Sequence, residues 1–163
     1  MPDPSLRDIL DFAIDAAWQA GRITLRHFQT GVAVERKADE SPVTVADRGT
    51  EQALREMIQE RFPGDAILGE EHGEEAGTTS RRWIIDPIDG TKSFVHGVPL
   101  YGVMIGVEVD GVPSVGVVNL PAMDEMVAAA VGLGCTWNGR PARVSEVSDL
   151  SEAVLLCTDF ESL

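Results

Sequence analysis

Trp83-Ile84-Ile85-Asp86-Pro87-Ile88-Asp89-Gly90-Thr91 is the stretch on which the fold and the chemistry of this chain depend. The apolar residues before Asp86 predict a buried strand. Pro87 has no N–H and pushes the residue before it toward an extended conformation, so we expect regular structure to stop there. Gly90 then allows a tight turn, and Thr91 can cap a following helix. The stretch therefore brings two carboxylates and several backbone N–H groups into one small volume.

Two interpretations of this stretch are open from its residues alone. Asp-Pro-x-Asp-Gly is ordinary turn chemistry, which occurs in almost every domain. Carboxylates and N–H groups in one place also suit hard divalent cations and phosphate oxygens. The second interpretation is favoured by further acids at Asp47, which opens a predicted helix, and at Glu70 and Glu71, which follow a predicted strand. An all-oxygen set of this kind prefers Mg²⁺ or Mn²⁺ to zinc.

Composition narrows the class of protein. A chain of 163 residues with 44% apolar and 25% charged residues suits one globular domain. A net charge of −14 argues against sequence-independent binding to nucleic acid or to anionic membranes, which requires basic patches. Cys135 and Cys157 cannot form a disulfide framework, and neither a signal peptide nor a membrane-length apolar run is present. We therefore expect a cytoplasmic protein.

The order of the predicted elements indicates an α+β fold, with two N-terminal helices packed on a largely antiparallel sheet. The helices are expected over residues 5 to about 28 and from 43–47 to about 62. Loops are expected at 37–42 and 74–80, and hairpin turns at 110–111 and 138–139. Strands are expected at 32–36, 66–69, 81–86, 101–109, 112–120, 125–131, 135–137 and from 153 to 157, with a short helix at 92–97.

Three ordered motifs resemble the inositol monophosphatase family. They are Asp-Glu-Ser-Pro-Val-Thr-Val-Ala-Asp at 39–47, Gly-Glu-Glu at 69–71, and the stretch at 83–91. The likeness covers nearly the whole chain, including the turn at 138–139 and the Val-Ser pair at 144–145. Members of this family are Mg²⁺-dependent, lithium-sensitive phosphatases of small phosphate monoesters. The resemblance implies the same activity, with a small-molecule phosphate monoester as the binding partner.

The resemblance also implies a set of metal ligands. Glu70, Asp86 and the carbonyl of Ile88 look like ligands of a first metal ion. Asp86 and Asp89 look like ligands of a second. Two or three Mg²⁺ ions are expected in all, with Mn²⁺ as a possible substitute.

Catalytic roles follow from the same likeness. Thr91 is similar to the threonine that, with Glu70, orients the attacking water, and Asp47 looks like the acid that hydrogen-bonds this threonine. The N–H groups of Gly90 and Thr91 would hold the substrate phosphate. The residues that the resemblance places against the substrate are Glu70, Ile88, Asp89, Gly90 and Thr91.

Within the family, residues 91–101 look closer to the histidinol-phosphate phosphatase branch than to the inositol branch. Inositol enzymes more often carry Thr-Asn where Lys92 and Ser93 stand. We therefore expect histidinol phosphate, an intermediate of histidine biosynthesis, as the substrate. Inositol 1-phosphate is the alternative. The resemblance makes a homodimer the expected assembly of the full-length protein.

The chain departs from the family after Asp89. The family's second half supplies a Trp-Asp motif that completes the second metal site, and nothing here matches it. We expect an N-terminal piece, with an α+β metal- and phosphate-binding domain at 1–150 and the start of a truncated C-terminal α/β domain at 151–163. A second hypothesis is therefore a non-catalytic metal- and phosphate-binding module. An interaction domain, supported only by the acidic surface, ranks third.

Overall fold

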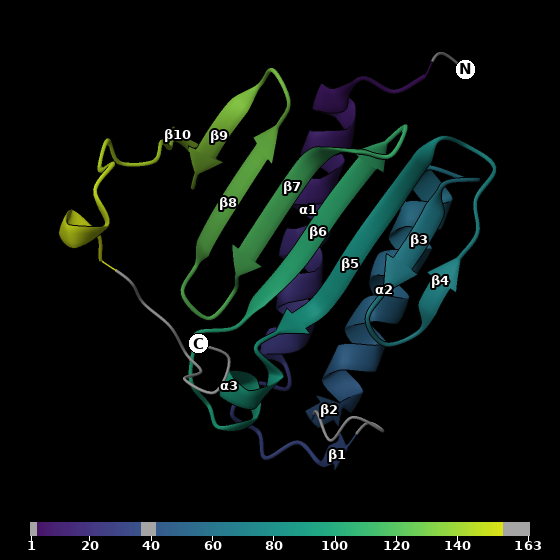
Figure 1. Ribbon diagram of the computed structural model, residues 1–163. Helices are drawn as coiled ribbons and strands as arrows, with labels where there is room; N and C mark the ends of the chain where they lie inside the picture. Colours follow the sequence, from purple (N-terminus) through teal and green to yellow (C-terminus); the bar gives the residue numbers. More distant parts are fainter. Residues whose placement is uncertain (1–2, 37–41, 155–163) are drawn as a thin grey trace.

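The computed structural model describes residues 3–36 and 42–154. In these residues two long helices, α1 (Leu6–Leu25) and α2 (Val45–Arg61), lie side by side on one face of an eight-stranded sheet (Figure 1). The opposite face of the sheet carries no helix within the described ranges (Figure 1). This arrangement confirms the expected α+β fold with two N-terminal helices.

The sheet is antiparallel except at one position. Its strand order is β10-β9-β8-β7-β6-β5-β3-β4, and only β3 and β5 run parallel. β1 and β2 form a separate antiparallel pair, and α3 (Thr91–Val95) and a 3₁₀ turn (Leu150–Glu152) complete the set. The strands are β1 (Val34–Arg36), β2 (Pro42–Thr44), β3 (Ala66–Gly69), β4 (Gly73–Glu75), β5 (Arg81–Asp89), β6 (Gly102–Val109), β7 (Val112–Leu120), β8 (Glu125–Ala130), β9 (Gly134–Trp137) and β10 (Arg140–Pro141).

Both long helices begin with the same side-chain arrangement. Ser5 Oγ accepts the N–H of Asp8 at 3.2 Å, and Asp8 accepts the N–H of Ser5 at 3.0 Å. Thr44 and Asp47 form the corresponding capping box at the start of α2. Such boxes satisfy N–H groups that have no acceptor within the helix, which fixes where each helix starts. The first helix was expected from residue 5, and Ser5 is the residue that caps it.

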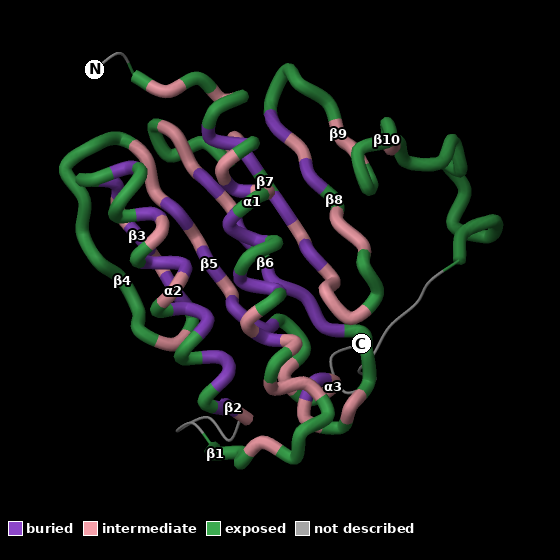
Figure 2. Tube along the Cα trace, turned by 180° about the vertical axis from the view of Figure 1, so that it is seen from behind, coloured by how far each residue is buried: buried purple, intermediate pink, exposed green. Residues whose placement is uncertain are grey.

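The main core lies between the two helices and the sheet. α1 packs on β6, β7 and β8, and α2 packs on β5 (Figure 2). Trp83 is fully buried in this layer, with the rings of Phe12 and Phe62 centred 5.5 and 5.2 Å from its own. Its indole N–H donates to Asp65 Oδ2 at 2.9 Å, so the buried polar atom is satisfied. Trp83 therefore packs β5 against the two long helices.

A smaller core lies beneath the turn that follows β5. It consists of Ala46, Ile88, Phe94 and Tyr101. The rings of Phe94 and Tyr101 meet edge to face with centroids 4.9 Å apart. Because Ala46 belongs to α2 and Phe94 to α3, this core ties the start of α2 to the turn at residues 88–91.

The structure corrects two expectations about regular structure. β5 does not stop before Pro87; it continues to Asp89, with a shift in its register against β6 between Asp86 and Asp89. A proline can occupy such an irregularity because no ladder hydrogen bond is required from its nitrogen. The expected loop at 74–80 begins as a strand, since β4 covers Gly73–Glu75.

The two hairpin turns are confirmed. Asp110 and Gly111 have φ values of 53° and 75°, and Asn138 and Gly139 have φ values of 47° and 75°. Two consecutive left-handed residues are what a tight hairpin turn requires.

Some predictions fall at the ends of the described ranges. Ala153 and Val154 lie outside regular structure, and residues 155–157 of the expected last strand lie outside the described residues. Residues 37–41 of the expected loop at 37–42 also lie outside the described residues. The division of the chain at residue 150 stays a prediction. No described helix combines the length and the apolar character needed to span a bilayer.

Candidate active site

The parallel pairing of β3 and β5 brings two of the predicted acids together. In this pairing Gly69 lies opposite Ile85, and the N–H of Glu70 donates to the carbonyl of Ile85 at 3.3 Å. Glu70 and Asp86 are the residues that follow this pair on the two strands. Because the two strands are parallel neighbours in this register, the two carboxylates lie next to each other.

The electrostatic environment of Asp86 reflects this crowding. Burial raises the pKa of Asp86 to about 7, with further contributions from the charge of Glu70, a hydrogen bond with Glu70 and the charge of Asp89. The N–H of Ile88, which donates to Asp86 Oδ1 at 3.0 Å, acts in the opposite direction on this pKa. Three carboxylates whose charges oppose one another form a site that a cation would stabilise.

Glycine at position 90 allows the turn after β5 to take its shape. Gly90 has φ of 86°, and a Cβ atom there would lie 3.2 Å from the carbonyl oxygen of Leu100. Only glycine adopts this conformation without strain. The turn places the hydroxyl of Thr91 3.1 Å from the carbonyl oxygen of Ile88 and 3.2 Å from Asp47 Oδ1.

Asp47 joins this turn to the start of α2. Its side chain is fully buried, and its Oδ2 accepts the N–H and the hydroxyl of Thr44 at 2.8 and 2.6 Å. Its Oδ1 accepts the hydroxyl of Thr91. One carboxylate therefore completes a helix cap and accepts a hydrogen bond from a hydroxyl group that also lies against the carbonyl of Ile88.

The donor groups around Asp86 for a metal ion are oxygen atoms. Within residues 3–36 and 42–154, no three His, Cys, Asp or Glu side chains form a ready-made metal cluster. Glu70 and Asp86 share a hydrogen bond, and Asp89 acts on Asp86 through its charge. With the carbonyl of Ile88, these groups offer only oxygen ligands, which Mg²⁺ and Mn²⁺ prefer. The chemistry of the residues therefore fits a hard divalent cation.

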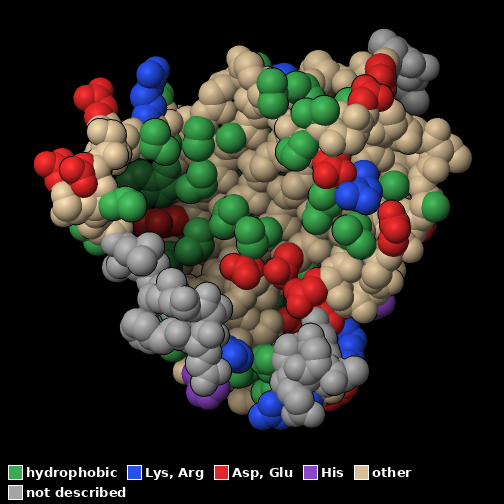
Figure 3. All heavy atoms as spheres, viewed as in Figure 1, with side chains coloured by type: hydrophobic (Ala, Val, Ile, Leu, Met, Phe, Trp, Pro, Cys, Tyr) green, Lys and Arg blue, Asp and Glu red, His purple; other side chains and the backbone are tan. Residues whose placement is uncertain are grey.

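Glu70 and Asp86 border a groove on the open face of the sheet. Figure 3, viewed from this side, shows acidic side chains next to hydrophobic ones near the middle of the face. The groove has a volume of about 640 Å³. Its lining residues are Leu68, Gly69, Glu70, Ile84, Ile85, Asp86, Met104, Ile105, Gly106, Gly116, Val117 and Val118.

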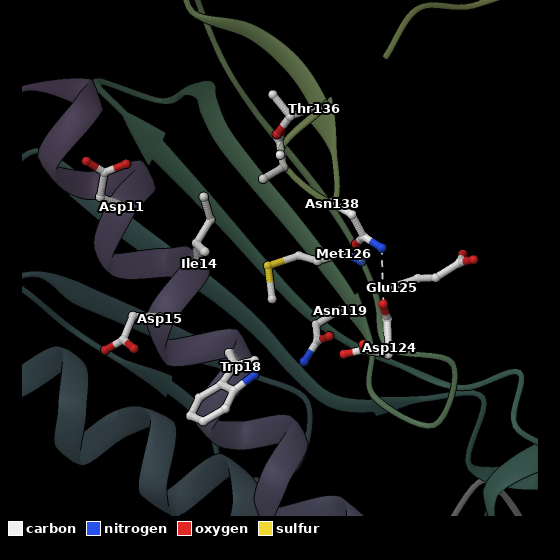
Figure 4. Close-up of a pocket in the computed structure, with 12 residues that line it drawn as sticks. Asp11, Ile14, Asp15, Trp18, Asn119, Asp124, Glu125, Met126, Thr136 and Asn138 are labelled. Atoms are coloured by element: carbon white, nitrogen blue, oxygen red, sulfur yellow. Dashed lines mark hydrogen bonds between the residues drawn. The ribbon is translucent and has the colours of Figure 1, made fainter. Parts of the chain in front are cut away.

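A second groove, of about 580 Å³, lies on the helix side of the sheet (Figure 4). Trp18 and Ile14 extend into it from α1, and Met126 faces them from β8 (Figure 4). Its remaining lining residues are Asp11, Asp15, Asn119, Asp124, Glu125, Ala128, Thr136, Asn138 and Gly139. It contains none of the residues predicted to bind metal or substrate or to take part in catalysis, so the open face is the candidate site.

Sequence reasoning missed one polar group close to the site. Glu51 is fully buried on α2, and it accepts the N–H groups of Glu71 and His72, the two residues after Glu70. The sequence signal was an acid four residues after Asp47, on the same side of the helix. A charged residue at such a position is usually taken for surface, which is why it was overlooked.

Comparisons with known proteins show what this chain is similar to. The model of the inositol monophosphatase family matches residues 5–162. A histidinol-phosphatase from Chlorobaculum parvum is 46% identical over 155 residues, which is 94% of this chain and 60% of that protein. Inositol monophosphatase 3 from Solanum lycopersicum is 38% identical over 155 residues, covering 93% of this chain and 58% of that protein.

The fold also matches a solved structure. The extragenic suppressor protein suhB from Bartonella henselae superimposes with a TM-score of 0.82 at 33% identity, over 85% of this chain and 55% of that chain. The chain thus spans about 60% of the length of the curated relatives it matches. The family match over almost every residue confirms the resemblance seen in the sequence motifs: this chain belongs to the inositol monophosphatase family.

Proposed function

We propose that this chain carries the catalytic residues of a Mg²⁺-dependent phosphomonoesterase. The observation that supports this most directly is the meeting of Glu70, which follows β3, and Asp86, which lies in the parallel neighbour β5. The hydrogen bond between Thr91 and Asp47 accompanies it. Family membership supports the same reaction class.

Four groups would hold the metal ions. They are the carboxylates of Glu70, Asp86 and Asp89 and the carbonyl of Ile88. When bound, Mg²⁺ neutralises phosphate charge and lowers the pKa of water, which makes water an effective nucleophile. The positive charge of a bound ion would also offset the repulsion between the carboxylates of Asp86 and Glu70.

The residues of the chain would position the water and accept its proton. The hydroxyl of Thr91 donates to Asp47, so a lone pair on Thr91 Oγ1 is left to accept a hydrogen bond from water. Glu70 takes the proton that the water loses as its oxygen attacks phosphorus. The bond from phosphorus to the ester oxygen breaks, and the alcohol leaves with a proton from solvent.

Backbone groups would hold the phosphate. Thr91 opens α3, so its N–H precedes the first hydrogen bond within that helix. Gly90 immediately precedes Thr91, so its N–H belongs to the same turn. Two adjacent N–H groups of this kind suit phosphate oxygens.

Histidinol phosphate is the proposed substrate. The Chlorobaculum parvum histidinol-phosphatase is more similar to this chain, at 46% identity, than inositol monophosphatase 3, at 38%. The Lys92-Ser93 pair favours the same branch. Inositol 1-phosphate is the second candidate, because the inositol enzyme also matches 93% of the chain.

The test is phosphate release from both esters, in Mg²⁺, in Mn²⁺ and after chelation. We expect turnover of histidinol phosphate that requires a divalent ion and disappears in Asp86→Asn. Asp110→Asn changes an acid in the exposed β6–β7 turn and serves as the matched control. Turnover that persists after chelation, or an Asp86→Asn variant as active as Asp110→Asn, would contradict the proposal.

A second candidate function is a non-catalytic metal- and phosphate-binding module. It is favoured by the share of the relatives that the chain spans, about 60%, and by the absence of a ready-made three-residue cluster in the described ranges. Calorimetry would then show Mg²⁺ binding without turnover of either ester. Measurable turnover by this chain alone eliminates it.

The expected homodimer, cytoplasmic location and two-part division stay predictions. Light scattering of the full-length protein would give the number of chains in the assembly, and we expect two.

A further inference from the structure

Glu51 is a buried carboxylate whose hydrogen bonds go to the chain just after Glu70. Its Oε2 accepts the N–H of Glu71 at 2.7 Å, and its Oε1 accepts the N–H of His72 at 3.1 Å. Arg55 Nε donates to Oε1 at 2.9 Å, and the ring nitrogen Nδ1 of His72 lies 3.1 Å from the same oxygen. A charge with no exposed surface requires such partners. Two of them are backbone groups of one turn.

Glycine at position 69 allows Glu51 to reach this turn. A Cβ atom at Gly69 would lie 2.1 Å from Glu51 Oε1 and 2.7 Å from Arg55 Nη2. Both distances are far below van der Waals contact, so any larger residue would displace the carboxylate. The first residue of the Gly-Glu-Glu motif therefore has to be glycine for a steric reason. The atoms that leave no room for a side chain there belong to Glu51 and Arg55 of α2.

The backbone at Glu70 is held from both sides. On one side its own N–H donates to the carbonyl of Ile85 at 3.3 Å, which links it to β5. On the other side the next two N–H groups are bound by Glu51. Rotation of the chain between these two attachments would turn the Glu70 side chain away from Asp86.

We propose that Glu51 is a positioning residue for Glu70: it holds the turn at residues 70–72 so that the Glu70 carboxylate meets Asp86. The catalytic part of this inference rests on the proposed phosphatase function. The metal-binding and backbone parts do not require turnover. Glu51 touches neither substrate nor metal in this scheme and acts through the turn.

A purely structural role for Glu51 makes different predictions, and Asp65 provides the comparison. Asp65 is also a buried carboxylate, and it accepts hydrogen bonds from Thr79, Arg81 and Trp83. Thr79 and Arg81 lie just before and at the start of β5, and the Trp83 ring packs against Phe12 and Phe62 on the helix side of the sheet. Loss of the Asp65 charge should lower stability without altering the site, since buried charge networks are costly to break wherever they lie.

The experiment compares Glu51→Gln with Asp65→Asn in the same protein. Glutamine keeps the shape of the side chain but has one carbonyl oxygen where Glu51 uses two. We expect both variants to melt at lower temperature. Only Glu51→Gln should weaken Mg²⁺ binding by about 10–100-fold, the usual effect of losing a residue that orients a metal ligand. It should also lower kcat with little change in KM, and it should speed hydrogen exchange at the N–H groups of Glu71 and His72.

The conservative variant supplies a rescue test. Glu51→Asp keeps both oxygens but withdraws them by one methylene, so its Mg²⁺ affinity should lie between those of the wild type and Glu51→Gln. Should Glu51→Gln fail to fold, Glu51→Asp carries the same comparison with Asp65→Asn.

The inference is overturned if Glu51→Gln and Asp65→Asn change Mg²⁺ affinity equally, or if the two N–H groups exchange as in the wild type. Failure of the proposed function gives a different result. In that case the wild type hydrolyses neither ester, and Mg²⁺ affinity and hydrogen exchange decide the role of Glu51 by themselves.

Discussion

The hydroxyl of Thr91 donates a hydrogen bond to Asp47 Oδ1 at 3.2 Å, which joins two residues 44 positions apart in the chain. The same carboxylate accepts two hydrogen bonds from Thr44. The start of α2 and the turn after β5 therefore share one buried acid. A change at this acid should affect the stability of the helix and the candidate chemistry together.

Replacing Asp47 by asparagine tests this dual role. An amide cannot accept hydrogen bonds on both of its terminal atoms, so either the cap or the Thr91 contact is lost. We expect a lower melting temperature and a kcat reduced by about 10²-fold or more, the scale of losing organised proton transfer. Asp8→Asn removes the equivalent acid from the capping box of α1 and should lower the melting temperature alone. Equal kcat values for the two variants would contradict the assignment.

Asp86→Asn should separate stability from metal binding. Removing a buried charge that Glu70 opposes should raise the melting temperature of the metal-free protein. Mg²⁺ at about 100 times its dissociation constant stabilises a protein by about 2.7 kcal/mol, and we expect this gain only in the wild type. Thermal melts with Mg²⁺ and with a chelator measure both effects. A variant that Mg²⁺ stabilises as strongly as the wild type would show that Asp86 is not a ligand.

The raised pKa of Asp86 predicts a specific pH dependence. The pKa is about 7 in the folded protein against an ordinary value of 3.8, so the neutral form is favoured by folding. The stabilisation that the neutral Asp86 side chain gives to the folded protein is complete at pH values below 3.8. It is lost as the pH rises through about 7. The metal-free protein should therefore lose stability across this interval, while stabilisation by Mg²⁺, which binds the ionised form, should grow. Melting curves across the interval give the result, and a pH-independent Mg²⁺ effect would refute it.

Gly90→Ala should damage the site through the backbone. The residue has φ of 86°, a conformation that costs residues with a Cβ atom about 1–2 kcal/mol. The new methyl group would also lie 3.2 Å from the carbonyl oxygen of Leu100. We expect a lower melting temperature and loss of phosphate release. Gly111→Ala has a similar φ of 75° with no atom within 4 Å of the new Cβ, so it should lose stability and keep its activity. Retained activity in Gly90→Ala would mean that the turn does not need this shape.

Local patterns in the sequence predicted most of the elements, because the forces that form them act over a few residues. The helix start at Ser5, the hairpin at Asp110 and the short strand Ala66–Gly69 follow from capping, turn chemistry and apolar runs. The continuation of β5 past Pro87 could not be predicted from these local patterns. A proline normally ends a ladder, and only the register shift against β6 allows the strand to continue.

The sequence by itself determined which residues are proposed to carry the chemistry: the acids at 47, 70, 86 and 89 and the Gly90-Thr91 turn are identifiable as motifs before any folding. Only the tertiary structure decided that Glu70 and Asp86 meet, because the parallel pairing of β3 and β5 joins segments separated by β4. It also decided that Glu51 is buried against the turn after Glu70, where Gly69 leaves the space. Contacts between distant segments depend on how the helices and strands pack together, and no local spacing encodes that packing.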